Sequence, residues 1–467
     1  MKQLIAMGIL KCAIAVAVLA VSAVGVRAQT TTNLNASQGL APVSTLENSA
    51  AGRAALVANL AVTGAVQDGT AQQPTLLPIP EQQQLALRDA FITRGNADQL
   101  ADGLGSTLGG AYQSLASYKS PDDGKTSSFT SISPATAQLF AYANATASSD
   151  SESGKFFFAN ATVDAKEPVS PAAMALFNEI GGTTDILGKA YGLPAGSNGA
   201  NRYGNSRPFL TEPYLVSFEG KDFFGVLSGN IAYLRGPTQD LTNSPSYPSG
   251  HTTYGYMDSL LLALLVPERY PQMVVRAAEY GNNRIILGAH YAMDVLGGRT
   301  LATYDLAQLL ANKPAYVGIK RRGVEIDDFN TTLIVSRGEL TKALESACGK
   351  PVAACARQDH SRFADTTRNR SFYDVTQTYG LPVVFPQTSS MAEDVAKLAP
   401  EAGYLLTVAF PYLTLAQADA ILSSTEGPGG GFLDNGSAFG VYSRLNLYRA
   451  AEEAIAAAPP AERGSAR

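Results

Sequence analysis

The stretch PSGHTTYGYMDSLLLALLV, residues 248–266, decides the fold that this sequence is expected to form. Its first residues end a polar loop (PTQDLTNSPSY), and the largely apolar run that follows is typical of a buried helix stopped by Pro267. Two further helices are expected after it, from residue 271 to about 287 and from 289 to 310. No alternation of strands and helices accompanies them, which argues against a doubly wound sheet. The sequence therefore predicts an all-α fold with a helical bundle core.

Histidine is rare in this chain, and its placement is informative. Only three histidines occur in 467 residues, and two of them belong to an ordered set that also contains arginines, a glycine turn and a carboxylate. The set comprises Arg207-Pro208, Pro248-Ser249-Gly250-His251 and Arg284-x5-His290-x3-Asp294. These are the parts needed for phosphoryl transfer through a histidine nucleophile.

The spacing of the last block assigns roles to its two ends. On a helix, His290 and Asp294 lie four residues apart and share one face, so the carboxylate can accept a hydrogen bond from one ring nitrogen. The other nitrogen of His290 is then free to attack. Asp294 is expected to fix the tautomer and to stabilise the charge that develops on the ring. His251 is expected to donate a proton to the departing oxygen, as the general acid.

The remaining residues of the set are suited to an anion. Ser249 and Gly250 stand at an expected helix start, where free N–H groups and the positive end of the helix dipole face a bound phosphate. Arg207 and Arg284 supply planar guanidinium groups that match phosphate oxygens. No metal is needed for this chemistry.

Each block also has a purely structural interpretation. The motif at 248–251 can be a turn with a helix cap, Arg284 a surface residue paired with Glu279, and the pair of residues 290 and 294 a buried core contact. The order of the blocks and their use of two of the three histidines favour a functional site. His360 stands in a polar loop outside the set and is expected to be solvated.

These blocks resemble the signature of the type 2 phosphatidic acid phosphatase superfamily, a helical family that includes bacterial class A acid phosphatases and vanadium-dependent haloperoxidases. The family signature reads Lys-x6-Arg-Pro, Pro-Ser-Gly-His and Ser-Arg-x5-His-x3-Asp, and the wording SYPSGHT at 246–252 is similar to that of the soluble acid phosphatases. The resemblance implies a phosphohistidine at His290 and proton donation by His251. It also implies that phosphate is bound by Arg207, Ser249, Gly250 and Arg284.

Two positions depart from the signature. Asn283 replaces the serine of the third block and keeps a hydrogen-bonding side chain. Ala200 stands where the family has lysine, seven residues before Arg207. Arg202 is the nearest cation in the sequence, and we expect it to reach the phosphate in place of that lysine.

Together with the N-terminal sequence described below, the resemblance implies a secreted, metal-independent acid phosphatase that hydrolyses small phosphate monoesters without a cofactor. We expect it to prefer acid pH, because the general acid must be protonated while the nucleophile is not. One alternative on the same fold is a vanadium-dependent haloperoxidase, in which His290 ligates vanadate at the phosphate position. A second alternative is a noncatalytic secreted phosphate- or anion-binding protein, an interpretation supported by Ala200 and by the long N-terminal arm.

The N-terminus predicts export. Residues 1–28 combine early lysines, the apolar run AIAVAVLAVSAVGV and a Val-Arg-Ala ending, which is typical of a signal peptide, with an uncleaved membrane anchor as the alternative. Removal of this segment leaves 32 basic and 40 acidic side chains, a net charge of −8, which is not typical of nucleic-acid binding. No later segment is apolar for long enough to predict an integral membrane helix. We therefore expect a soluble mature protein of the periplasm or the extracellular space, while the sequence leaves its oligomeric state open.

Two cysteines remain after removal of the signal peptide. Cys348 and Cys355 lie seven positions apart, and in an oxidising compartment they are expected to form a local disulfide. Two buried free thiols are the alternative. A metal site is less favoured because only His360 is near and no CxxC spacing is present.

Composition divides the chain into six expected segments. They are a signal peptide (1–28), a low-complexity and loosely ordered N-terminal arm (29–85), an accessory helical region (86–165), a phosphatase core with the three signature blocks (166–315), a C-terminal helical part that packs on the core (316–455) and a disordered tail (456–467).

Overall fold

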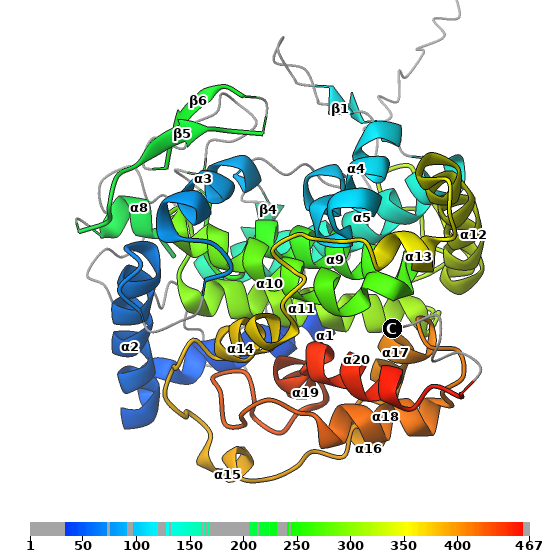
Figure 1. The fold of residues 1–467 in the computed structure, drawn as a ribbon. Coiled ribbons are helices and arrows are strands. Elements are labelled where there is room, and N and C mark those ends of the chain that lie inside the picture. Colours follow the sequence, from blue (N-terminus) through cyan, green and yellow to red (C-terminus); the bar gives the residue numbers. More distant parts are fainter. Residues whose placement is uncertain are drawn as a thin grey trace, which may run out of the picture. The chain divides into compact units, whose positions relative to one another are not determined.

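Three consecutive helices form the centre of the fold. They are α9 (Gly250–Leu265), α10 (Tyr270–Ile286) and α11 (Ala292–Leu310), with the short 3-10 turn η4 (Pro267–Arg269) between the first two. In this computed structural model the three helices are buried on nearly every side and run through the middle of Figure 1. A helix that is apolar around its whole circumference is stable only inside a larger body. The structure confirms the all-α class.

The structure describes residues 33–71, 75–90, 97–116, 118–119, 128–129, 132–160, 162–163, 167–168, 205–212, 214–223, 225–230, 241 and 244–460. Contacts divide the chain after Thr31, and every described residue belongs to the unit Thr32–Arg467. The expected signal peptide, the position of Arg202 and most of the expected tail lie outside the described residues.

The expected loosely ordered arm is helical where the structure describes it, so this expectation was wrong. The arm forms α1 (Leu34–Leu40), the 3-10 helix η1 (Ala41–Asn48), α2 (Ala50–Gln67) and α3 (Ile79–Asp89). Side-chain oxygens of Asn33 and Ser49 cap the first and third of these by accepting the N–H groups of Ala36 and Gly52. Alanine has the highest helix propensity, and the caps satisfy donors that a helix start leaves open. Packing of α1 on α5, and of α2 on α10 and α11, completes the stabilisation.

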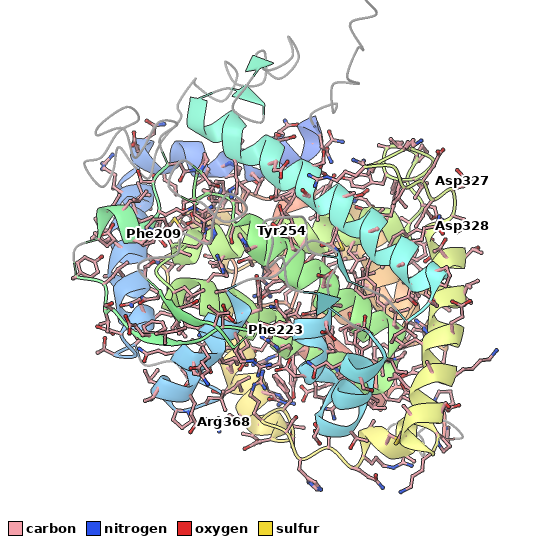
Figure 2. All side chains as sticks on the ribbon, turned by 90° about the horizontal axis from the view of Figure 1, so that it is seen from above. Phe209, Phe223, Tyr254, Asp327, Asp328 and Arg368 are labelled. Carbon is pink, nitrogen blue, oxygen red and sulfur yellow. A yellow bond between two sulfur atoms is a disulfide. The ribbon has the colours of Figure 1, made fainter. Side chains whose placement is uncertain are left out.

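The accessory region contains the longest described helix. After η2 (Asp98–Leu104) and α4 (Ser106–Leu115), α5 runs from Pro134 to Asn160 through a stretch whose turn-rich sequence supports no helix assignment by itself. It packs on α9, α11 and α12. Figure 2 shows α5 crossing over α9, with Tyr254 of α9 beside it. The fold therefore places a segment from far upstream against the start of α9.

Strands are short in the described parts of the chain. Three antiparallel pairs form, each of two strands: β1 (Tyr118–Lys119) with β2 (Ser128–Phe129), β3 (Thr162–Val163) with β4 (Glu167–Pro168), and β5 (Glu219–Lys221) with β6 (Leu227–Gly229). In the last pair Glu219 is opposite Gly229 and Lys221 is opposite Leu227. The turn α8 (Pro208–Thr211) precedes this hairpin.

The C-terminal part packs on the central helices, as the red and orange ribbons of Figure 1 show. Its elements are α12 (Phe329–Cys348), α13 (Val352–Ala356), α14 (Thr366–Thr376), α15 (Pro386–Ser389), α16 (Val395–Leu398), η5 (Pro400–Gly403), α17 (Tyr404–Thr407), α18 (Leu415–Ser424), α19 (Ala438–Arg444) and α20 (Leu447–Ala456). A disulfide joins Cys348 at the end of α12 to Cys355 in α13.

Two apolar clusters hold these elements together. The larger is built around α9 and α10 and extends to α12 and α20, and the smaller joins the N-terminal arm to α11 and the 379–385 and 432–439 segments. Among the described helices, none is by itself long and apolar enough to cross a membrane. A pair bent by 100°, Asn35–Asn48 with Ala50–Gln67, meets the length and composition test only when its two parts are taken together.

Candidate active site

The three sequence blocks meet at one place. Arg207 is the N-cap of α8, Gly250 opens α9, Arg284 stands in the last turn of α10, and His290 and Asp294 flank the start of α11. The backbone N–H of Ser249 donates to the carbonyl of Asp294 at 3.0 Å, which fixes the second block to the third. Arg207 Nη1 lies 2.8 Å from His290 Nε2, which joins the first block to the third.

His290 is fully buried and stands just before α11, which begins at Ala292. The expectation that residues 290 and 294 share a helix face is therefore wrong in detail, because the Asp294 carboxylate caps the helix by accepting the Tyr291 N–H at 2.8 Å. A guanidinium group only donates hydrogen bonds, so His290 Nε2 is the acceptor from Arg207. The hydrogen of the neutral ring is thus assigned to Nδ1, and the Nε2 lone pair points at the arginine.

The Nδ1 side of His290 faces two oxygen atoms. Asp294 Oδ2 and Ser246 Oγ each lie 3.4 Å from Nδ1, and the Ser246 hydroxyl itself donates to Asp294 Oδ2. Burial raises the pKa of Asp294 to about 6, against the opposing effect of the hydrogen bonds from Ser246 and the Tyr291 N–H. The carboxylate is therefore oriented by two donors before the imidazole carries any charge.

The surroundings of His290 keep its imidazole neutral. Its pKa lies well below the ordinary value, first because the ring is buried, and then because Arg207, Lys155, Arg284 and His251 surround it with positive charge. A neutral imidazole is the nucleophilic form. The site thus keeps the ring neutral, and its Nε2 lone pair accepts a hydrogen bond from Arg207.

Arg207 is oriented by backbone carbonyls and one side-chain hydroxyl. Its Nε donates to the Ser244 carbonyl at 2.8 Å, its Nη1 to the Ala289 carbonyl at 3.1 Å and its Nη2 to Ser244 Oγ at 3.0 Å. The side chain is fully buried. A guanidinium that is already oriented loses little conformational freedom when an anion binds.

The N-terminal residues of α9 form one side of the site. Ser249 Oγ caps the helix by accepting the Thr252 N–H at 3.1 Å. A Cβ at Gly250 would lie 3.0 Å from Ser151 Oγ, so glycine is what permits the close approach of α5 here. His251 is half-buried, and its ring centroid is 6.1 Å from that of Tyr254.

Arg284 is anchored from the opposite side. It is fully buried and its Nη1 donates to the Ala90 carbonyl, just after α3, at 3.2 Å. Glu279, the alternative partner that the sequence suggests, is paired instead with Arg276 and Arg362. Arg284 is therefore not a surface residue of α10.

Comparisons with known proteins agree with this geometry. Residues 201–310 match the model of the PAP2 superfamily. This segment belongs to the PAP2 superfamily. Among its relatives, an acid phosphatase of Zymomonas mobilis is 34% identical over 109 residues, which cover 23% of this chain and 36% of the relative. A non-specific acid phosphatase of Salmonella typhimurium is 36% identical over 93 residues, 20% of this chain and 37% of the relative. A non-specific acid phosphatase of Providencia stuartii is 36% identical over 91 residues, which cover 19% of this chain and 35% of the relative. The chain thus spans about a third of the length of these curated relatives.

Two side chains of the site were missed by sequence reasoning. Lys155, from α5, lies outside the PAP2 segment and only 3.5 Å from Ser244 Oγ through its Nζ. No signal in the sequence points to it, because only the packing of α5 on α9 brings it to the site. Ser246 is the first residue of the SYPSGHT motif, and its place in that motif is the only sequence feature that points to it.

Other predicted residues lie elsewhere. Arg202 and Ala200 are outside the described residues, so the expected role of Arg202 stays a prediction. His360 is exposed and apart from the PAP2 segment. In the portions of the chain that the structure describes, no group of three or more His, Cys, Asp or Glu side chains is arranged to hold a metal ion.

Proposed function

We propose that this protein is a phosphatase that hydrolyses phosphate monoesters through a phosphohistidine at His290. The observation that carries the proposal is the buried His290 ring, whose Nε2 lone pair faces Arg207 while its Nδ1 faces Asp294. The acid phosphatases that match the PAP2 segment support the reaction class. No metal or cofactor takes part in the proposed reaction.

In the first step, the Nε2 lone pair of His290 forms a bond to phosphorus as the bond from phosphorus to the ester oxygen breaks. His251 gives its proton to that oxygen, which leaves as an alcohol. The Nδ1 hydrogen stays on the ring throughout, so the phosphorylated ring is positively charged and is stabilised by Asp294. This requirement explains why the carboxylate is oriented before the reaction begins.

In the second step, water attacks phosphorus and the bond from phosphorus to Nε2 breaks. His251 now accepts the proton of the water, and inorganic phosphate is released. The guanidinium groups of Arg207 and Arg284 and the N–H groups at the start of α9 face the oxygens of the transferring group. Fixed donors of this kind lower the barrier because they need no reorganisation when charge moves onto those oxygens.

The decisive experiment measures p-nitrophenyl phosphate hydrolysis by the purified protein in EDTA between pH 4 and 8. We expect turnover in the wild-type protein and a loss of at least about 10³-fold in His290→Ala, since removal of a nucleophile abolishes the covalent route. His360→Ala is the matched control, because it removes an exposed histidine outside the site. Equal loss in both variants, or no turnover in the wild-type protein, would sink the proposal.

Orthovanadate distinguishes the proposed phosphatase from a haloperoxidase on the same fold. We expect it to inhibit hydrolysis by occupying the phosphate position. Bromide oxidation by the vanadate-loaded protein with hydrogen peroxide, in the absence of ester hydrolysis, would instead establish the haloperoxidase.

Export of the protein is part of the proposal. The signal-like sequence of residues 1–28 and the disulfide between Cys348 and Cys355 both support an oxidising compartment. The mass of the protein isolated from its native host tests this, because a chain that retains residues 1–28 in the cytoplasm would contradict export.

A further inference from the structure

Lys155 is an unusual lysine. It is 6% exposed, and among the described residues its one hydrogen bond is the 3.5 Å contact from Nζ to Ser244 Oγ. Within the described residues, no carboxylate forms an ion pair with it. A buried ammonium group without an ion pair is costly, because the charge loses its hydration and gains little in return. A functional reason is therefore needed for a lysine at this position.

The residues around Lys155 indicate what this function is. Ser244 Oγ also accepts from Arg207 Nη2, so both cations point to the same hydroxyl. A Cβ placed on Gly250 would lie 3.5 Å from the Cε atom of Lys155, which puts the lysine against the start of α9. The ammonium group thus stands between a guanidinium that contacts His290 and the helix start where an anion is favoured.

We propose that Lys155 binds the phosphoryl oxygens of the substrate, and that α5 thereby supplies the cation that the PAP2 segment lacks at Ala200. This inference rests on the proposed function of the site. In this proposal Lys155 takes the place of that lysine, whereas the expected role of Arg202, outside the described residues, stays a separate prediction. The phosphate site of this chain is then composite, because one of its ligands comes from outside the segment shared with the acid phosphatases.

The placement of α5 is precise enough for this role. Asn144, on the same helix, donates from Nδ2 to Asp258 of α9 at 2.5 Å, and Asp150 accepts from Asn33 of the N-terminal arm at 2.6 Å. A Cβ placed on Gly154 would lie 3.4 Å from Pro248 Cδ, at ordinary van der Waals distance, so this turn of α5 packs directly beside the motif. The helix is therefore fixed by contacts that lead up to the turn that carries Lys155.

Electrostatics support an anion at this position. The pKa of Lys155 lies well below its ordinary value, because of burial first and then the charge of Arg207, while Glu152 and Asp294 raise it and Arg284 lowers it further. The groups that face this region also include His251 and His290. A bound phosphate would add negative charge among these cations and raise the pKa of Lys155. Phosphate binding should therefore be accompanied by proton uptake.

The test measures inorganic phosphate binding to the purified protein by calorimetry, in two buffers that differ in ionisation enthalpy. We expect Lys155→Met to weaken binding by about 10- to 100-fold, as for the loss of one charge-assisted hydrogen bond, and to reduce the proton uptake. Lys155→Arg should recover part of the affinity, since it restores a cation. Lys342→Met, which removes an exposed lysine on α12, is the matched control and should bind phosphate as the wild-type protein does.

Stability provides an independent readout. If Lys155 serves ligand binding, Lys155→Met should melt at the same temperature as the ligand-free wild-type protein or higher, because it removes a buried amine whose protonated form has no ion pair. A lower melting temperature with unchanged phosphate affinity would show a structural lysine and overturn the inference.

The outcomes separate the inference from the proposed function. Phosphate binding that depends on Lys155 without ester hydrolysis supports the inference and rejects the phosphatase. Hydrolysis and phosphate affinity that are both unchanged in Lys155→Met reject the inference and leave the phosphatase standing. A wild-type protein that binds no phosphate overturns both.

Discussion

At the scale of single residues, activity at low pH depends on the protonation state of Asp294, which is set by its hydrogen-bond partners and its burial. Its Oδ2 atom receives the Ser246 hydroxyl and the Tyr291 N–H, and it also faces His290 Nδ1. The two donors favour the ionised carboxylate, whereas burial opposes it and raises its pKa to about 6. Asp294 supports the nucleophile only when it is ionised, so the protonation of this group sets a lower pH limit for activity.

Replacement of Ser246 should move that limit. Without the hydroxyl, the pKa of Asp294 rises above about 6, so at any acid pH a smaller fraction of the carboxylate is ionised. We expect the acid limb of kcat/KM for p-nitrophenyl phosphate in Ser246→Ala to move to higher pH by about one unit, the equivalent of a hydrogen bond to a charged group. Ser259→Ala, which changes an equally buried serine on α9, is the control and should leave the limb in place. A lower plateau with an unshifted limb would show that Ser246 acts on position alone.

The residues of the site differ in how far their place in it can be predicted from the sequence. His251, Ser249 and Gly250 are contiguous, and the spacing of Arg284, His290 and Asp294 is fixed by the end of one helix and the start of the next. Such local geometry can be predicted from sequence. Lys155 reaches the site only through the packing of α5 on α9, which no spacing encodes. The sequence therefore pointed to a nearby arginine, Arg202, which lies outside the described residues and whose role stays a prediction.

At the scale of elements, α3 supports α10 behind Arg284. Asp89, the last residue of α3, accepts two hydrogen bonds from Arg276, at 2.8 and 2.6 Å, and a third from Asn283 Nδ2 at 2.8 Å. Gln82 donates to Asn283 Oδ1 at 2.8 Å. Asn283, which replaces the serine of the family signature, therefore ties α10 to both ends of α3. The Ala90 carbonyl that binds Arg284 follows directly after Asp89.

Replacing Asn283 with the serine of the family signature should weaken the contact between α10 and α3. A serine is too short to donate to Asp89 and accept from Gln82 together, so we expect Asn283→Ser to lower the free energy of unfolding by about 1–3 kcal/mol in urea titrations. Activity should remain, because Asn283 does not face the reacting atoms. The control is Asn282→Ser: this neighbour is equally buried, and its side chain makes no hydrogen bond to the described residues. Equal losses in both variants would mean that side-chain volume, rather than the hydrogen bonds, decides the effect.

Elements were predictable where apolar residues repeat with helical spacing over a long run. The helices expected at 251–266, 271–287 and 289–310 correspond to α9, α10 and α11, with the last beginning later because Asp294 caps it. The arm and α5 lacked this pattern. Their small and polar residues are buried in helices because caps and tertiary packing, which composition does not show, determine their structure.

At the scale of the whole molecule, the fold buries many carboxyl groups that resist ionisation. Burial raises the pKa of Asp258 and of Glu393 to about 8, and that of Asp98 to about 6. Asp150 and Asp305 hydrogen-bond to each other, and the pKa of both is raised. Such groups bind more protons in the folded state than in the unfolded state. Their contribution to stability is fully present below the unfolded pKa, near 4, and is lost as pH rises through the folded pKa.

The whole protein should therefore melt at a higher temperature near pH 5 than near pH 8. His290 and Lys155, whose pKa values are both lowered by burial, oppose this trend, His290 below about pH 6.5 and Lys155 also above it, but the raised carboxyl groups outnumber them. Asp258 tests whether buried carboxyl groups cause this trend. It is fully buried, its carboxylate accepts from Asn144 at 2.5 Å, and burial raises its pKa to about 8. Asp258→Asn keeps a neutral acceptor for Asn144, so at pH 8 we expect it to be more stable than the wild-type protein, by on the order of 3 kcal/mol, and to show a smaller fall between pH 5 and 8. Asp327→Asn, at an exposed position labelled in Figure 2, should follow the wild-type curve. Thermal melts of the three proteins at pH 5 and pH 8 decide the question, and a wild-type protein that is more stable at pH 8 would contradict the assignment of buried neutral carboxyl groups.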